Sequence, residues 1–319
     1  MNIDLSPEAA EYGRQALRAF EAAGGDELVR RTEAEPKRRA ALVGPVLDGL
    51  GALDLDPRGD ARELEAAAAL CRAAGHFAVP FPVAERLSRP TGLGTDGLLV
   101  VDRARPSGAV AGLDLRWTAV TLDGHRTGAV ARAPEGPPRT SAFVTELDLE
   151  PLDGDGDGAR DLALGLVLPC WTLLGMLDRA IDLTRRHVLV REQFGQVLAR
   201  FQGVRFQLTE AEVERSGVEA LAKYALWSVQ ARRDEAVDDA LALRLAAVEA
   251  ADVVFRVAHQ LHGAIGFCDE AFLSWLSRYS LPLRRLPLGP SGTRDLLARR
   301  LGRRGLTGLF GDARERAAR

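Results

Sequence analysis

Four residues in the middle of the chain have the types and spacing of a loop that binds a hard cation. Asp153, Asp155 and Asp157 stand at alternate positions, and Gly158 takes the sixth position of the pattern. Oxygen ligands at this spacing suit calcium, which also needs a bidentate glutamate at the twelfth position. Leu164 stands there instead, so we interpret the segment as a solvated acidic hinge and predict no metal site.

Two further patterns lack a part that their chemistry requires. His259 and His262 are three residues apart, with Asp269 and Glu270 nearby, but no third metal ligand follows at a recognisable spacing. Residues 92–97 (GLGTDG) spell the glycine pattern of a dinucleotide-binding turn. That turn needs a strand before it and a helix after it, whereas here a proline-containing loop precedes and a strand-like run follows. We expect neither a metal nor a dinucleotide at these positions.

The elements that position these residues fall into three regions, and the first is helical. From residue 7 to about 84 the pattern is that of amphipathic helices, with Leu42, Val46 and Leu50 on one face. A second helix is expected over residues 61–74. Gly75 supplies a stop, and Pro80 with the proline at position 82 prevents the helix from resuming.

The second region, from about residue 90 to 157, has the pattern of short strands. Apolar runs alternate with Gly, Pro and Asp turns, and Asp123-Gly124 between two such runs indicates a hairpin. The expected strands are residues 98–101, 109–113, 117–122, 128–131 and 142–145. We therefore predict a small β region that ends in the acidic hinge.

The third region is helical again. The expected helices cover residues 162–191, 201–232, 235–262 and 270–279, and a last one begins near residue 293. The two long middle helices are apolar on one stripe and charged on the other, as in helix bundles. The predicted fold is mostly α with a small β domain, divided into residues 1–84 (helical), 85–158 (β) and 159–319 (helical bundle).

Composition narrows the class of protein. The net charge of -3 gives no electrostatic reason to expect nucleic acid or an anionic membrane. No stretch of about 18 apolar residues lacks charge, so we predict no membrane span, and the N-terminus has no secretory apolar segment. The three cysteines are far apart and odd in number, which fits free thiols in a reducing cytoplasm.

Two segments of the bundle carry a family resemblance. The first is residues 191–195 (REQFG), followed by Phe201 and Gln202, and the second is residues 260–267 (QLHGAIGF). Together they resemble the C-terminal domain of acyl-CoA dehydrogenases, which carry Arg-x-Gln-Phe-Gly, then Phe-Gln, then Gln-x-x-Gly-Gly-x-Gly-Phe/Tyr. The resemblance is firm over residues 160–280 and implies an N-terminal helical domain, a reduced middle β domain and a C-terminal four-helix bundle.

The resemblance implies that the chain contacts FAD across a subunit interface. In that family the FAD of one subunit lies partly against the helical domain of its neighbour. Arg191 would fork onto the pyrophosphate, Phe194 would pack against the adenine end, and Gly263 would permit close approach of the backbone. The cofactor-binding residues that the resemblance implies are Arg191, Gln193, Phe194, Gln202, Gln260, Gly263 and Ala264, the last standing where a second glycine is usual.

The same resemblance implies a missing catalytic base. The family reaction removes a proton from the α-carbon of an acyl-CoA and passes a hydride from the β-carbon to flavin, which requires a carboxylate in a dry pocket. Members of the family carry this glutamate at one of two positions. The first corresponds to Pro287 or Leu288 in this chain, and the second corresponds to Gly165. Asp161 and Asp295 are the nearest acids, and each would need a displacement of a helical turn or more.

These features imply a hetero-oligomer. The chain is similar to the short subunit of the heterotetrameric, steroid-degradation type of acyl-CoA dehydrogenase, which works with a full-length subunit that supplies the base. The resemblance further implies an acyl-CoA substrate, and it makes an electron-transfer flavoprotein a candidate electron acceptor. Two alternatives stay open: a self-sufficient homo-oligomeric enzyme with a relocated base, and a flavin-free scaffold that only binds a partner.

Overall fold

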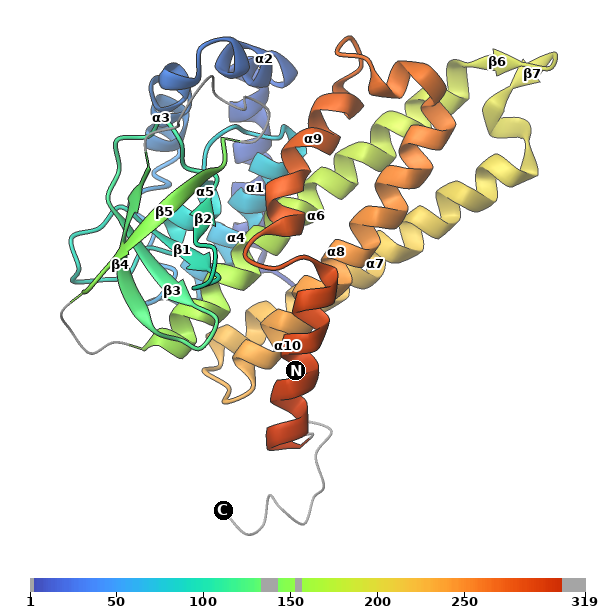
Figure 1. The fold of residues 1–319 in the computed structure, drawn as a ribbon. Coiled ribbons are helices and arrows are strands. Elements are labelled where there is room, and N and C mark those ends of the chain that lie inside the picture. Colours follow the sequence, from blue (N-terminus) through green and yellow to red (C-terminus); the bar gives the residue numbers. More distant parts are fainter. Residues whose placement is uncertain (1–2, 133–142, 153–156, 306–319) are drawn as a thin grey trace.

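The computed structural model describes residues 3–132, 143–152 and 157–305 (Figure 1). The N-terminal helices are α1 (Pro7–Ala22), α2 (Asp26–Ala34), η1 (Pro36–Arg38), α3 (Arg39–Gly49), α4 (Ala61–His76) and α5 (Val83–Leu87). The strands of the middle region are β1 (Gly97–Val101), β2 (Ser107–Gly108), β3 (Trp117–Thr121), β4 (Arg126–Ala131) and β5 (Thr145–Glu150). The C-terminal elements are α6 (Gly158–Val190), β6 (Glu192–Gln193), β7 (Gln196–Val197), η3 (Leu198–Arg200), α7 (Gln202–Gln230), α8 (Ala236–His262), η4 (Gly263–Phe267), α9 (Phe272–Arg285) and α10 (Pro290–Arg304). The predicted fold class, mostly α with a small β domain, is confirmed.

Side-chain caps fix where several helices begin. Asp60 accepts hydrogen bonds from the first main-chain N–H groups of α4, and Ser6 does the same for α1. Asp157, the last acid of the predicted hinge, caps α6 by accepting from the N–H of Arg160 at 2.9 Å. The rest of the acidic run, residues 153–156, lies outside the described residues. The described end of the predicted hinge is therefore a helix cap.

The sheet has the strand order β1-β3-β4-β5-β2. β1 runs parallel to β3, while the β3–β4, β4–β5 and β5–β2 pairs are antiparallel. Asp123 and Gly124 lie between β3 and β4, and Gly124 has a φ of 85°, as the predicted hairpin requires. The prediction of a strand over residues 109–113 was wrong, since only Ser107 and Gly108 pair there.

Two glycines let α4 and α6 cross closely. A Cβ at Gly75 would lie 1.9 Å from the main-chain oxygen of Thr172, and one at Gly175 would lie 1.9 Å from that of Arg72. No side chain fits at such a distance, so glycine is the only residue that permits this backbone contact. The contact joins the N-terminal helices to the bundle, because α4 belongs to the first region and α6 to the third.

The two helical regions share one hydrophobic core. Its buried residues come from α1 to α5 and from α6 to α9, and Trp171 of α6 is among the largest fully buried side chains. A second, smaller core lies under the sheet and includes Leu99, Trp117 and Leu147. α6 is long and apolar enough to cross a membrane by length and composition, but 83% of its apolar window is buried inside the fold. Its apolar surface is therefore used for packing.

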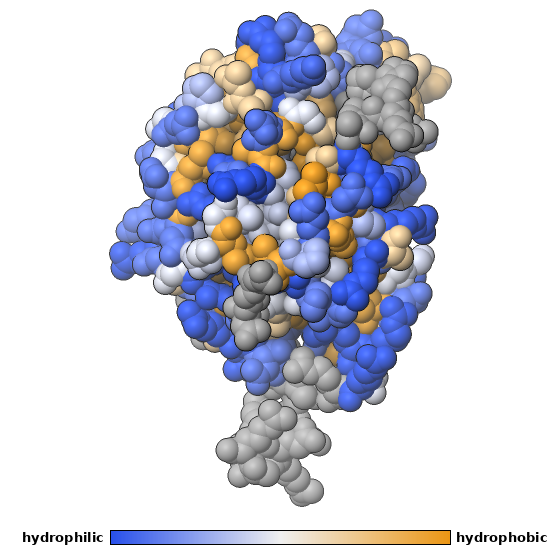
Figure 2. Space-filling model, turned by 60° about the vertical axis from the view of Figure 1, so that its left-hand side comes forward, coloured by the Kyte–Doolittle hydropathy of each residue, from blue (hydrophilic) through white to orange (hydrophobic). Residues whose placement is uncertain are grey.

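The sheet and the short β6–β7 hairpin lie at opposite ends of the molecule. In Figure 1 the five-stranded sheet is on the left and the hairpin projects at the far upper right, with the long helices α6, α7 and α8 between them. The face turned forward in Figure 2 has hydrophobic residues gathered in its middle and hydrophilic residues around them. The bundle thus holds two surfaces apart, one over the sheet and one at the hairpin.

Candidate functional site

A hollow of about 440 Å³ lies at the hairpin end of the bundle. Five of the seven predicted cofactor-binding residues line it: Arg191 and Gln193 come from the end of α6 and from β6, and Gln260, Gly263 and Ala264 from the end of α8 and from η4. The two motifs are far apart in sequence, and the fold brings them together because α6 and α8 end side by side. All five residues are exposed in this chain.

Arg191 offers an unused guanidinium to this hollow. Its main-chain N–H donates to the oxygen of His187 at 2.9 Å, and its main-chain oxygen accepts from Leu198 at 2.8 Å. These bonds hold the backbone where α6 ends. The guanidinium itself makes no hydrogen bond or ion pair with any residue that the structure describes. An arginine anchored in this way suits a bound anion, because its five N–H groups remain available for a phosphate.

Gly263 ends α8 with a backbone that only glycine adopts readily. Its φ is 65° and its ψ is -147°, a combination that side chains with a Cβ avoid. Nothing lies within 4 Å of where its Cβ would be, so the backbone there is open to a ligand. Ala264, in the place of the family's second glycine, is exposed and follows in η4.

The β6–β7 hairpin projects Phe194 into solvent. Phe194 and Gly195 form the two-residue turn, with φ values of 54° and 80°. Positive φ at both central residues is the geometry that matches the twist of a tight hairpin. Phe194 is 90% exposed, and its ring meets that of Phe201 edge to face, with ring centroids 6.2 Å apart. A large aromatic held in strained backbone and left in water is suited to contact another molecule.

Phe194 and Gln202 do not line the hollow. Gln202 is the exposed first residue of α7. The two residues therefore lie on the outer side of the same end, where they could meet a ligand that extends beyond the hollow. The structure brings five predicted residues into one cavity and leaves these two next to it.

A pair of histidines lines the same hollow and was not predicted as part of the site. The rings of His187 and His262 stack with centroids 4.5 Å apart and planes 18° apart. Burial lowers the pKa of both imidazoles, and for His187 the neighbouring His262 and Arg191 lower it further. His259 stacks instead on Phe267, at 4.3 Å. Among the described residues no three His, Cys, Asp or Glu side chains gather as metal ligands.

The positions where the family carries its base face a second, much smaller cavity. Gly165 and Pro287 both line a space of about 60 Å³ between β1, α6 and the segment after α9. A Cβ at Gly165 would lie 2.6 Å from Val100 Cγ2, so a carboxylate there would require Val100 to move. The acid that does line the cavity is Glu85 of α5, and burial raises the pKa of its carboxyl group. Sequence reasoning missed Glu85, because nothing in its local pattern connects α5 to this cavity.

Asp161 and Asp295 occupy very different surroundings. Asp161 is 0% exposed and accepts a hydrogen bond from Arg58 Nη1 at 2.5 Å, and its other oxygen accepts from Arg126 Nε. Both oxygens are therefore engaged by guanidinium groups. Asp295 is exposed on α10. Neither aspartate lines the cavity that Gly165 and Pro287 share.

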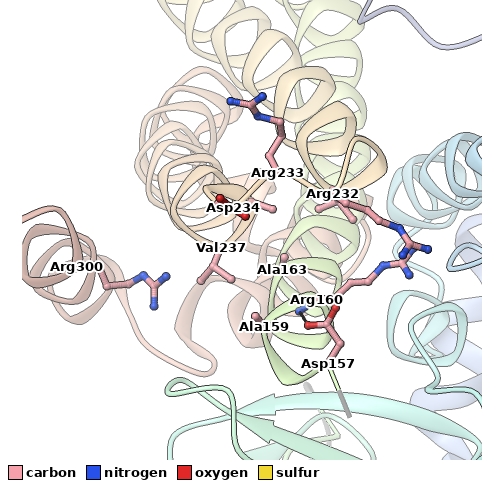
Figure 3. A pocket seen from close by; sticks show the side chains of 11 residues that line it. Asp157, Ala159, Arg160, Ala163, Arg232, Arg233, Asp234, Val237 and Arg300 are labelled. Atoms are coloured by element: carbon pink, nitrogen blue, oxygen red, sulfur yellow. Dashed lines mark hydrogen bonds between the residues drawn. The ribbon is translucent and has the colours of Figure 1, made fainter. Parts of the chain in front are cut away.

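A third hollow, of about 350 Å³, lies at the other end of the bundle (Figure 3). Four arginines line it, and Figure 3 shows Arg160 and Arg232 reaching to one side while Arg300 comes from the other. Three of the four already have partners within the chain: Arg160 donates to the main-chain oxygen of Arg58, Arg233 pairs with Glu235, and Arg300 pairs with Asp238. Asp157 and Asp234 also line the hollow. Because the chain itself satisfies most of this charge, we assign no ligand here.

Comparison with known proteins agrees with the bundle motifs. The family model described as "Acyl-CoA dehydrogenase, C-terminal domain" matches residues 161–306. Over 133 residues the chain is 33% identical to 3-sulfinopropanoyl-CoA desulfinase of Paraburkholderia xenovorans. That alignment covers 41% of this chain and 30% of the desulfinase, so it spans less than a third of the relative's length.

Solved structures share the fold over nearly the whole chain. The ChsE4–ChsE5 complex from Mycobacterium tuberculosis superposes with a TM-score of 0.77 at 18% identity, covering 97% of this chain and 100% of that one. The Tcur3481–Tcur3483 steroid ACAD gives a TM-score of 0.74 at 19% identity, covering 94% and 99%. Residues 161–306 therefore match the acyl-CoA dehydrogenase C-terminal domain, and the chain as a whole shares the fold of these solved structures.

Proposed function

We propose that this chain is a subunit of an FAD-dependent acyl-CoA dehydrogenase, and that it completes the FAD site of a partner subunit that supplies the catalytic base. The observation that carries the proposal is that the hollow around Arg191 and the five-stranded sheet lie far apart on the same chain. The cofactor-type hollow lies at the hairpin end of α6, and the sheet lies at the opposite end (Figure 1). A flavin that rests on this chain's own sheet is therefore remote from Arg191.

The residues of the hollow fit the phosphate end of FAD. A dinucleotide pyrophosphate needs cationic donors and a backbone that it can approach closely. Arg191 supplies a guanidinium that has no partner among the described residues, Gly263 supplies an open backbone, and Gln193 and Gln260 supply amide groups in the lining. FAD bound there by a partner would supply the hydride acceptor of the reaction, and this chain would hold its phosphates.

The cavity beside Gly165 and Pro287 argues against catalysis by this chain alone. Its volume of about 60 Å³ equals the space of about two water molecules, which is far too small for an acyl thioester. Apolar and proline residues close it, among them Leu166, Leu286 and Pro287. The partner subunit would therefore supply both the acyl pocket and the base that takes the α-proton.

The substrate class and the partner are part of the proposal. Two structures that share the fold are named as pairs of chains, and one of them is described as a steroid ACAD. We infer that the partner is a full-length acyl-CoA dehydrogenase subunit and that the substrate is a bulky acyl-CoA of the steroid type. A purified complex that oxidises only straight-chain acyl-CoAs would refute the substrate assignment.

Glu85 keeps one alternative in view, a self-sufficient enzyme with a relocated base. Its carboxyl group lines the small cavity, and its raised pKa favours the protonated form. If the cavity opened to admit substrate, Glu85 would be the base nearest to it. Under this alternative the chain alone binds flavin, acyl-CoA bleaches that flavin, and Glu85→Gln abolishes the bleaching. Under our proposal the chain alone does not react with acyl-CoA.

FAD retention in the complex tests the proposal against a flavin-free scaffold. The complex of this chain with a full-length subunit is purified with Arg191→Ala, with Arg232→Ala as the matched control at the other end of the bundle. Arg191→Ala should weaken FAD binding ten- to a hundredfold, since a charge-assisted hydrogen bond contributes roughly 1.5–3 kcal/mol. Arg232→Ala should leave FAD retention unchanged. Equal FAD affinity in both variants would favour the scaffold.

A further inference from the structure

The stacked pair His187 and His262 adds a feature to the hollow that the bundle motifs do not explain. His187 lies on α6, one turn before Arg191, and His262 is the last residue of α8. The rings meet across the seam between the two helices, at 4.5 Å. Both are half-buried and both line the hollow. The pair therefore stands beside the guanidinium that the proposed function assigns to phosphate.

The hydrogen bonding of His262 identifies the atom that takes up a proton. His262 Nδ1 is 2.8 Å from the main-chain oxygen of Ala258. A carbonyl oxygen only accepts, so Nδ1 carries the hydrogen and Nε2 of the neutral ring carries the lone pair. Protonation at Nε2 turns the ring into a cation with a second donor. The same stack places any charge on His262 directly against His187.

Among the described residues, no acid pairs with either of these two rings. Arg191, at the end of α6, and the ring of His262 are the charged or titratable groups that act on His187, and His262 in turn acts on His259 of α8. η3 and α7, which pack at the same end, bring the exposed Arg200 and Arg205. β6 brings the exposed Glu192, which does not line the hollow, and η4 brings no charged residue. Within the described part of the chain, neither ring has a carboxylate partner, and no acid lines the hollow. Two protonated rings beside Arg191 would repel one another unless an anion entered.

We propose that His187 and His262 are further anion-binding residues of this hollow, and that a pyrophosphate diester binds there together with proton uptake by the pair. The inference rests on the proposed function, since it takes FAD as the source of the diester. Without the anion, the repulsion and the burial keep the rings neutral. With the anion between Arg191 and the rings, the charged form of the rings is stabilised. Binding should therefore be tighter at mildly acidic pH.

The size of the effect follows from linkage. If the bound anion raises the pKa of one ring by about one unit, affinity changes by about tenfold across that ring's titration. A contribution from both rings would increase the change further. The affinity rises as the pH falls from the pKa of the complex towards the lower pKa of the free protein, because in that range only the complex holds the extra proton.

The test uses the full chain alone with ADP-ribose, a flavin-free pyrophosphate diester whose phosphate charge does not change during the titration. NMR follows the ring signals of the five histidines as a function of pH, with and without ADP-ribose. His125, which lies in the hairpin between β3 and β4, serves as the internal control. We expect ADP-ribose to raise the pKa of His187 and His262 by about one unit and to leave His125 unchanged.

Variants separate this proposal from the proposed function. His187→Phe keeps a ring for stacking but removes the proton, so the pH dependence of ADP-ribose binding should fall while His125→Gln leaves it intact. Unchanged His187 and His262 titrations, or a shift of equal size at His125, would overturn the inference. The measurement involves neither a partner nor a flavin. If the hollow binds ADP-ribose with the predicted proton uptake but the chain contributes to no FAD site in any complex, the proposed function is refuted and the present inference is not.

Discussion

Replacing Asp161 with asparagine should destabilise the fold strongly, and the reason is a buried ion-pair network. The Asp161 carboxylate is fully buried between Arg58, whose side chain is 9% exposed, and Arg126 of β4. Arg58 also donates to the main-chain oxygens of Ser88 and Arg89, at 2.5 and 2.8 Å. One carboxylate thus links the segment before α4, the sheet and α6. The substitution leaves two guanidinium groups without their counter-charge.

Removing one partner of a buried ion pair costs about 3–5 kcal/mol. The two main-chain oxygens still accept from Arg58, so we expect the lower end, about 3 kcal/mol. For a chain of 319 residues that corresponds to a fall in Tm of roughly 4–5 °C. Thermal and urea unfolding measure the loss, and Asp295→Asn, at the exposed carboxylate of α10, should change nothing. An Asp161→Asn variant that keeps its stability but loses turnover in the complex would show that Asp161 is the base.

Four other perturbations have defined outcomes. Gly175→Ala should destabilise the fold by about 3 kcal/mol or more, since its Cβ would overlap the main-chain oxygen of Arg72, whereas Gly44→Ala meets no atom within 4 Å and should be neutral or stabilising in urea unfolding. Burial, with a contribution from Arg179, lowers the pKa of His76 to about 4. The unfolded chain therefore binds this proton first, and the free energy of unfolding should fall as the pH drops from about 6.5 towards 4. His76→Gln should reduce this loss in unfolding measured as a function of pH, and a variant with the same pH profile as the original chain would contradict the prediction. Phe194→Ala should leave Tm unchanged, because the ring is 90% exposed, yet lower the FAD content of the complex, and equal FAD content would rule out the contact. Glu85→Gln should leave turnover of the complex intact, and a complete loss would favour the relocated base.

Helical periodicity predicted the bundle well because the long helices bury one continuous stripe each. The expected helix over residues 201–232 corresponds to α7 and that over 235–262 to α8, within a few residues at each end. The hairpin at Asp123-Gly124 was also predicted correctly, since these turn residues favour the backbone conformation of a tight turn. These are local signals. Each is contained in the residues that form the element.

The strand expected over residues 109–113 failed for a reason that lies elsewhere in the chain. The guanidinium of Arg39, buried on α3, donates to the main-chain oxygens of Ala109 and Ala111. In a strand these oxygens would accept hydrogen bonds from a neighbouring strand. Here the Arg39 side chain takes that place, so no strand pairing forms. β5 begins later than expected, at Thr145, and its alternating burial through Glu150 was a signal in the sequence that the prediction did not use.

The candidate site was predictable in part. Family motifs predicted Arg191, Gln260 and Gly263, and the fold places them around one hollow. Stacking of His187 on His262 depends on where α6 and α8 end relative to one another, and no single segment contains that information. The same holds for Glu85, whose cavity is formed by α5, β1, α6 and the segment after α9. Contacts between distant elements are therefore what the sequence left unpredicted.

The number of FAD molecules per polypeptide in the purified complex tests the central claim most directly. The chain is co-expressed with a full-length acyl-CoA dehydrogenase subunit, and flavin absorbance is compared with the protein content of each chain. If this chain only completes the partner's site, the complex holds about one FAD for every two chains, and the chain alone is colourless. One FAD for each chain, or a yellow isolated chain that acyl-CoA bleaches, would contradict the account.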